Sequence, residues 1–196
     1  MMKRIFAVAS LMLAMTLGNL AFAAEPQASS AAQPKPTFAA VYDKLISNAE
    51  KEVVDAADAM PEDKFNFAPS GSGEFKGVRT YAQQIKHIAA VNYLLGASLL
   101  GEKPPVDINE EKGPDNITSK TDVLKYLKDS FAYAHKAAAG LNEANLLEQL
   151  KPPFGSRPMT RLAIVTIMIY HPYDHYGQMV EYLRMNSIIP PASRGQ

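Results

Sequence analysis

The feature that most limits the fold of this chain is a set of long segments whose apolar residues recur at three- and four-residue intervals. Four such segments are expected, at residues 37–60, 80–100, 119–139 and 160–186. This spacing places the apolar side chains along one face of an α-helix. Glycine and proline separate the segments, and no stretch alternates like a β-strand. The sequence therefore predicts an all-α fold.

Four helices of this length are the elements of a four-helix bundle, each burying one apolar face against the others. The third helix is expected to begin at Ser119 or Thr121, both suitable N-caps. The connections at residues 64–79, 102–120 and 141–159 are too long for a minimal up-and-down bundle, so at least one is expected to cross over. The predicted inner faces are Phe38, Val41, Leu45, Ala49, Val53 and Ala56; Gln84, His87, Val91, Leu94, Ala97 and Ser98; Leu124, Leu127, Phe131, Ala134 and Ala138; and Ile164, Met168, His171, His175, Met179 and Tyr182.

The first 23 residues have the features of a secretory signal peptide. Lys3 and Arg4 precede an apolar run, and small residues follow at 21–23. We expect cleavage after Ala23 and a periplasmic or secreted protein without a membrane anchor, because the apolar run is short for a span; an uncleaved anchor is the alternative. Residues 24–36, rich in Ala, Ser, Pro and Gln, predict a disordered spacer. The bundle is expected at 37–191 and a short tail at 192–196.

Composition excludes several classes of function. The chain has 20 basic and 20 acidic residues and no long run of either sign. Binding to nucleic acid or to an anionic membrane surface is therefore not expected. The chain contains no cysteine, which excludes disulfides, thiolate ligands, a thiol nucleophile, a lipid anchor on cysteine and covalently attached c-type haem.

Three of the four histidines lie on predicted inner faces. His171 and His175 are four residues apart on the last helix, so their rings share one face, and His87 lies on the inner face of the second. Three imidazoles with one position left free form an open metal site. Buried histidines that are hydrogen-bonded to neighbours are the alternative. His135 lies beside the inner face of the third helix, near its C-terminus, and is left out of the site.

Other helical metal designs do not fit this chain. The metallopeptidase motif needs a glutamate directly after the first histidine, where this chain has Pro172. Di-iron bundles need a glutamate three residues before each histidine, and these positions hold Gln84, Met168 and Pro172. Haem bound non-covalently between His87 and His171 is allowed by the sequence but has no motif in its favour.

Pro172 itself has two interpretations. A proline inside a helix removes one backbone hydrogen bond and costs about 3 kcal/mol. Either a strained helix passes through Pro172, as suits a functional site, or two helices meet there and Pro172 opens the second.

Several neighbouring residues are secondary candidates. Gln178, and less so Asp174, would orient a histidine ring, although Asp174 is expected in solvent. The tyrosines around the site, Tyr170, Tyr173 and Tyr176, are expected to pack or to form an interface. The arginines Arg157 and Arg161 are expected to lie in solvent or to bind an anion. The methionines Met168, Met179 and Met185 are expected to fill the core.

The stretch "HPYDHYGQMVEYLRMNSIIPP" resembles the C-terminal signature of the DinB-like (DinB/YfiT) superfamily. The matching features are the paired histidines, Gly177-Gln178, Tyr182-Leu183-Arg184 and Pro190-Pro191. "QQIKHIAAVNYLL" places His87 where the family has its remaining histidine, and "AMPEDKFNFAP" resembles the family's exit from the first helix. The resemblance extends over residues 37–191. Pro172 departs from the ordinary helical residue that the family has there.

The resemblance implies a bundle of unusual connectivity with a divalent metal at His87, His171 and His175. Zinc is the first expectation, and nickel, iron or manganese are alternatives. Characterised relatives include metal-dependent transferases and isomerases that use low-molecular-weight thiols. We therefore expect a metal-dependent transferase or hydrolase acting on a small molecule or a thiol. The alternative is a non-catalytic bundle that binds or senses a metal or ligand. Proteins of this type are often dimers, so a homodimer is also expected.

Overall fold

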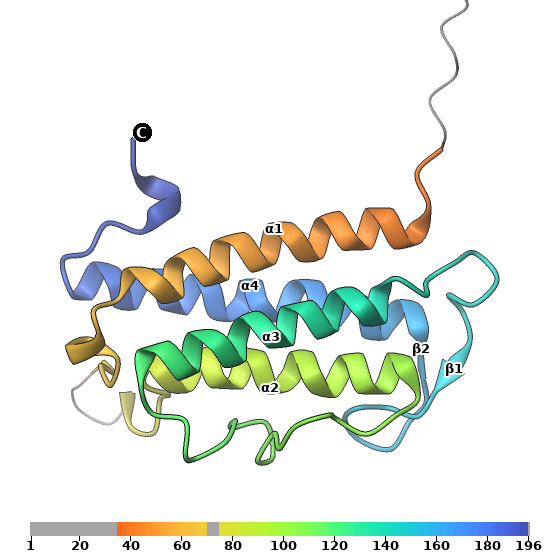
Figure 1. Cartoon of the computed structure of the whole chain (residues 1–196), viewed down its shortest axis with the longest axis horizontal. Helices are drawn as coiled ribbons and strands as arrows, with labels where there is room; N and C mark the ends of the chain where they lie inside the picture. Colours follow the sequence, from red (N-terminus) through yellow and green to blue (C-terminus); the bar gives the residue numbers. More distant parts are fainter. Residues whose placement is uncertain (1–34, 70–74, 196) are drawn as a thin grey trace, which may run out of the picture. The chain divides into compact units, whose positions relative to one another are not determined.

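The computed structural model describes residues 35–69 and 75–195, and these residues form a bundle of four long α-helices (Figure 1). The helices are α1 (Phe38–Ala59), α2 (Tyr81–Leu100), α3 (Lys120–Ala138) and α4 (Arg161–Met185). Single 3₁₀ turns lie at Glu62–Lys64 and Pro191–Ser193. The predicted all-α bundle is confirmed. The predicted signal peptide, and residues 24–34 of the predicted spacer, lie outside the described residues. No helix among the described residues is both long and apolar enough to cross a membrane.

A hydroxyl side chain caps the start of every long helix in this part of the chain. Thr37, Thr80, Ser119 and Thr160 each accept a hydrogen bond from the backbone N–H three residues ahead. These bonds satisfy amides that have no partner within the helix. The third helix is capped by Ser119 and not by Thr121. Gly101 ends α2 in the left-handed conformation, with φ of 70°, which glycine adopts without steric cost.

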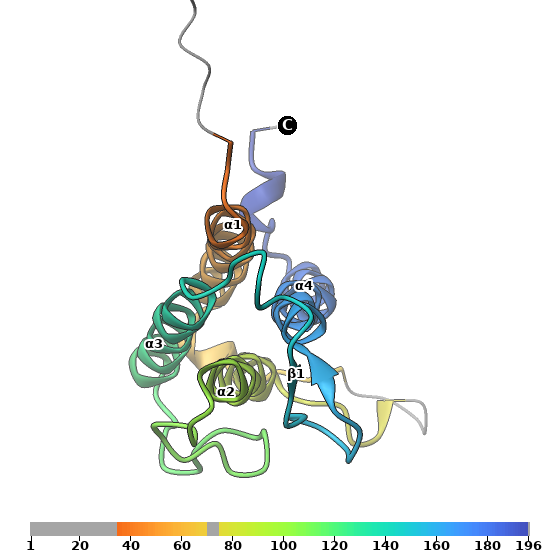
Figure 2. The same ribbon diagram turned by 90° about the vertical axis from the view of Figure 1, so that its right-hand side faces the viewer.

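The connectivity contains the predicted crossover. Helices α2 and α3 run in the same direction, and α1 and α4 run in the opposite one (Figure 1). Residues 101–119 must therefore return along the length of the bundle before α3 begins. Seen end-on, each helix has two neighbours (Figure 2). Helix α2 packs against α3 and α4, and α1 also packs against α3 and α4. The antiparallel pair α2 and α4 brings the first half of α2 beside the second half of α4.

Most residues of the predicted inner faces are buried, but four are only partly buried, and the first part of α1 is exposed. The partly buried residues are Leu94, Ser98, Leu124 and His171. Ala49, Val53 and Ala56 are fully buried on α1. The preceding residues of the same predicted face are not, because apolar spacing identifies a face but not how much of its length the partner helices cover. The exposed fractions are 42% for Phe38, 42% for Val41 and 39% for Leu45. Met185, at the end of α4, is 56% exposed, so the prediction that it fills the core is wrong.

Helix α4 continues unbroken through Pro172. The interpretation that two helices meet at this residue is therefore wrong. Pro172 is itself buried, and so are Met168, His175 and Met179 on either side of it. Packing of these side chains against the other helices offsets the roughly 3 kcal/mol that an internal proline costs.

The connection between α3 and α4 contains a small antiparallel ladder that the sequence does not predict. Its strands are β1 (Gln149–Leu150) and β2 (Met159–Thr160), with Gln149 opposite Thr160. Strands of two residues are too short to show an alternating pattern. Arg161 holds the ladder to the bundle by donating to the carbonyl of Leu99 at 2.6 Å and to the carboxylate of Glu148 at 2.7 Å. Its role is therefore structural, whereas Arg157 is exposed.

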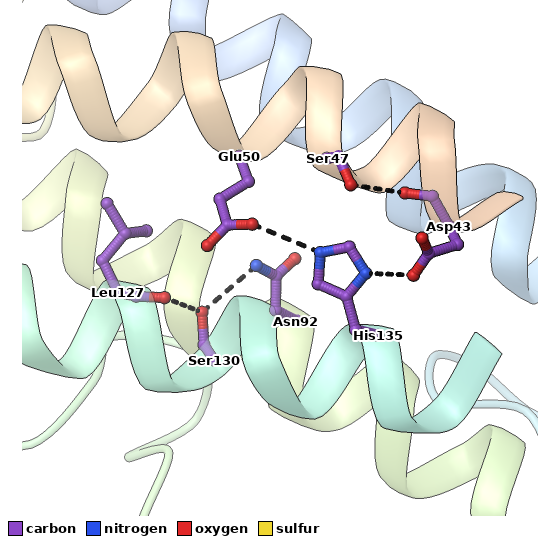
Figure 3. Close-up of polar contacts among 7 residues, drawn as sticks. All are labelled: Asp43, Ser47, Glu50, Asn92, Leu127, Ser130 and His135. Carbon is purple, nitrogen blue, oxygen red and sulfur yellow. Dashed lines mark hydrogen bonds and ion pairs between the residues drawn. The ribbon is translucent and has the colours of Figure 1, made fainter. Parts of the chain in front are cut away.

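His135 belongs to a polar contact between α3 and α1 (Figure 3). Its Nδ1 lies 2.7 Å from a carboxylate oxygen of Asp43, and its Nε2 lies 3.2 Å from one of Glu50. Deeper in the bundle the Asn92 amide donates to the Ser130 hydroxyl at 3.2 Å, joining α2 to α3 (Figure 3). His135 thus has a structural role between two helices.

Gly96 faces Tyr133 and Ala137 of α3, and it offers a test of this packing. A Cβ atom at Gly96 would lie 2.7 Å from two ring carbons of Tyr133. We expect Gly96→Ala to destabilise the protein, because overpacking costs about 1–3 kcal/mol and outweighs the gain in helix propensity of about 1 kcal/mol. The matched control is Gly177→Ala on α4, where a Cβ meets no atom within 4 Å. This control should be stabilising. Urea unfolding of both variants measures the difference, and equal stabilisation of the two would contradict the close packing.

Candidate metal centre

The structure brings His87, His171 and His175 together between α2 and α4. Each offers one ring nitrogen, and these three nitrogens lie within 4.8 Å of one another. The ring centroids are 4.7 to 5.0 Å apart, and the Nε2 atoms of His87 and His171 are separated by 3.1 Å. The predicted convergence of three imidazoles from two helices is therefore observed. We refer to these residues as the histidine triad.

The ring of His87 is oriented by the crossover connection. Its Nδ1 lies 2.7 Å from the backbone carbonyl of Glu111 and must donate to it, which leaves the lone pair on Nε2. Residues 109–111 all have positive φ, between 43° and 73°, an unfavourable conformation for residues other than glycine. Lys86 holds this segment against α2 by donating to the carbonyls of Pro114 and Ile117. Strained backbone thus supplies the acceptor for His87.

The ring of His175 is oriented by a chain of two glutamines. Its Nδ1 lies 2.6 Å from the side-chain oxygen of Gln84, and the amide nitrogen of Gln84 donates to the side-chain oxygen of Gln178 at 2.8 Å. Gln178 was predicted to orient a ring, and it does so through Gln84. Gln84 was missed as a functional residue, although its position one helical turn before His87, on the same face, carried the signal.

His171 has a different environment. Its Nδ1 is buried and has no hydrogen-bond partner within residues 35–69 and 75–195. The polar contact of this ring is made by Nε2, toward His87 at 3.1 Å. The orientation of His171 therefore depends on what lies at the centre of the histidine triad.

Burial keeps all three rings neutral. The pKa of His171 is lowered to about 3, mainly by desolvation and also by His175, His87 and Arg79. The pKa of His175 is lowered to about 4, mainly by desolvation and also by His87 and Arg79, against the opposing effect of the Asp174 carboxylate. The pKa of His87 is lowered mainly by desolvation, against the opposing effect of its bond to Glu111. Neutral imidazoles present the lone pairs that a metal ion needs.

The geometry fits a small ion better than haem. A zinc ion binds imidazole nitrogen at about 2.0–2.1 Å, so two ligands of a tetrahedral site lie about 3.3 Å apart. The observed separation of 3.1 Å between the Nε2 atoms of His87 and His171 is close to this value. Axial ligands on opposite sides of a haem iron would need about 4 Å, with the porphyrin ring between them. The geometry therefore gives no support to haem between His87 and His171.

The other candidates near the triad lie outside it. Asp174 is exposed, as expected. The Tyr170 side chain is 56% exposed. Tyr173 and Tyr176 are partly buried, with their ring centroids 6.4 Å apart. No hydrogen bond joins these tyrosines to the histidine triad in the described part of the chain. Tyr173 and Tyr176 pack against the core, whereas Tyr170 is exposed.

Comparisons with known proteins agree with this architecture. The model of the DinB superfamily matches residues 45–179, which include all three histidines. The crystal structure of a DinB-like protein from Bacillus cereus ATCC 10987 superposes with a TM-score of 0.60 at 15% identity, covering 76% of this chain and 93% of that one. No curated protein matches the sequence. The family match spans more than half of the chain, and the chain therefore belongs to the DinB superfamily.

Proposed function

We propose that this protein binds one divalent metal ion through the Nε2 atoms of His87, His171 and His175 and acts as a metal-dependent transferase or hydrolase on a small molecule. The observation that supports the proposal is the direction of the rings. His87 and His175 each use Nδ1 to donate to an acceptor outside the histidine triad, and so direct the lone pair of Nε2 inward. Such outer hydrogen bonds fix the tautomer and raise the basicity of a metal ligand.

Zinc is the proposed metal, because three neutral imidazoles without a carboxylate suit zinc better than magnesium or calcium. Nickel, iron and manganese are the alternatives. When bound, a zinc ion held by three protein ligands supplies Lewis acidity at a fourth position open to a substrate or a low-molecular-weight thiol. The chain's own contribution is to hold the three rings neutral and to exclude bulk water from them.

A second candidate function is a bundle that binds or senses a metal without turnover. His87 and His175 are each only 6% exposed, which favours a closed site, although His171 is only partly buried. Cobalt-substituted protein distinguishes the two functions, because a small thiol that reaches a fourth position changes the visible absorption of the cobalt ion. An unchanged spectrum at saturating thiol would favour the sensing or storage function.

We also propose that the protein is exported. The basic residues, apolar run and small residues at 1–23 support this proposal. The mass of the mature protein, recovered from the periplasm of an expressing bacterium, should correspond to a chain that begins at Ala24. A full-length chain retained in the cytoplasm would contradict it.

The metal proposal is tested by elemental analysis and X-ray absorption of the purified wild-type protein. We expect one metal ion per chain, with three nitrogen ligands at about 2.0–2.1 Å if the metal is zinc. A protein that stays free of metal after incubation with zinc, nickel, iron and manganese would refute the proposal.

Gln84 gives a graded test of the outer hydrogen bonds. We expect Gln84→Ala to lower zinc affinity by about 10–100-fold, because Nδ1 of His175 loses its acceptor. Gln178→Ala should have a smaller effect, since Gln178 contacts Gln84 and not the histidine. Competition with a chelator of known affinity measures both. Equal affinities in the wild type and Gln84→Ala would show that this hydrogen bond does not support the site.

A further inference from the structure

A pocket of about 560 Å³ lies beside the histidine triad, at the start of α2. Gln84 and Gln178, which form the hydrogen-bond chain to His175, also line this pocket. One glutamine side chain therefore separates the pocket from a ring of the histidine triad. A molecule in the pocket would be next to the proposed metal ion.

The pocket is rich in positive charge. Arg79, Lys86 and Lys112 line it, against one acidic residue, Asp115. Lys86 is engaged by the carbonyls of Pro114 and Ile117 at 3.0 and 3.3 Å. Lys112 has a long contact of 3.4 Å with Glu110, and both side chains of this pair are exposed. Asp115 accepts a hydrogen bond from Asn109 at 3.1 Å.

Among the described residues, Arg79 is the cation of this pocket whose side chain has no hydrogen-bond or ion-pair partner. Its side chain is exposed and forms no hydrogen bond or ion pair with any residue in the ranges 35–69 and 75–195. Its charge lowers the pKa of His87, His171 and His175, so its electrostatic effect extends to the whole histidine triad. A planar guanidinium binds an oxyanion through two parallel hydrogen bonds.

Side chains, and not the helix backbone, supply the hydrogen-bond donors here. The first amides of α2 are already used: Tyr81 and Ala82 donate to the carbonyls of Phe67 and Phe65, and Gln83 donates to the Thr80 hydroxyl. The side-chain oxygen of Gln83 accepts from the amide of Thr80 at 2.8 Å, and within residues 35–69 and 75–195 its NH₂ group donates to no other group. Gln83 also lines the pocket.

We propose that this pocket binds the oxyanion group of a small anionic substrate, with Arg79 as the main binding residue and the amide of Gln83 as a second donor. The inference rests on the proposed function, because it assigns the substrate of the histidine triad to the class of small organic anions. The substrate's reacting group would then lie toward the fourth position of the metal, while its carboxylate or phosphate group is held at Arg79.

The test is isothermal titration of the zinc-loaded and the metal-free protein with succinate, and with succinamide as the neutral probe of the same length. We expect succinate to bind and succinamide not to bind measurably. Arg79→Gln should weaken succinate binding by about 10-fold or more, as expected for loss of a charge-assisted pair. Arg79→Lys should give a smaller loss, because lysine keeps the charge but not the paired donors. Added sodium chloride should weaken binding to the wild type.

The matched control is Arg157→Gln, an exposed arginine outside this pocket, which should bind succinate like the wild type. Titration of the metal-free protein with inorganic phosphate distinguishes a preference for phosphate from one for carboxylate. The inference is overturned if wild type shows no succinate binding, if succinamide binds equally well, or if Arg79→Gln and Arg79→Lys both retain wild-type affinity. A wild type that holds no zinc but binds succinate through Arg79 would refute the metal proposal while supporting the pocket.

Discussion

Replacing His171 by alanine is expected to lower zinc affinity by more than about 100-fold, beyond the 10–100-fold typical of losing an outer hydrogen bond to a ligand. His87 and His175 would still present two neutral nitrogens, but two ligands do not hold zinc as three do. Their own orientation should persist, because Glu111 and Gln84 fix it independently of His171. Metal content per chain, followed by chelator competition, measures the loss.

His135→Ala is the control for this experiment. It also removes one imidazole from the chain, but one that contacts Asp43 and Glu50 between α1 and α3. We expect it to keep full metal content while losing about 1–2 kcal/mol of stability with its polar contacts. Equal metal content in the wild type and His171→Ala would rule out His171 as a ligand. Loss of metal in His135→Ala alone would place the site elsewhere.

Acid should destabilise the metal-free protein well above the pH at which most carboxylates titrate. The pKa of His171 is about 3 and that of His175 about 4 in the folded chain, against 6.5 for an ordinary histidine. Between these values the unfolded chain binds protons that the folded chain excludes, so stability falls as pH decreases from about 6.5 toward 4. Each ring would contribute at most about 2.5 kcal/mol between pH 7 and pH 4.5, and solvent screening of these partly exposed rings reduces the expected total loss to about 3 kcal/mol.

Urea unfolding in the presence of a chelator, at several pH values between 4.5 and 7, measures this dependence. Metal-free His171→Ala is the control, because it lacks one of the two rings and should show a shallower dependence. The slopes are compared and not the absolute stabilities, since the truncation itself leaves a cavity. Equal slopes in the two proteins would show that the histidine triad does not carry the acid sensitivity.

Local sequence was enough to predict the helices and the three candidate histidines. Helix starts depend on short-range bonds. Thr37, Thr80 and Thr160, where predicted helical segments begin, are the N-caps of α1, α2 and α4. The faces of His87, His171 and His175 follow from the helical repeat, because residues four apart lie one above the other. Their convergence could be anticipated since all three lie on faces that are predicted to be buried.

The tertiary structure alone decided what surrounds these rings. The acceptor for His87 is the backbone carbonyl of Glu111, which no side-chain pattern reveals, and it is delivered by a connection that crosses the length of the bundle. The exposed start of α1 and the unbroken path of α4 through Pro172 were likewise decided by which partner helices lie alongside. The physical reason is the range of the interactions. Caps and helical faces depend on residues within about one turn. Burial, ring orientation and the charge around Arg79 depend on residues distant in sequence that only the packed bundle brings together.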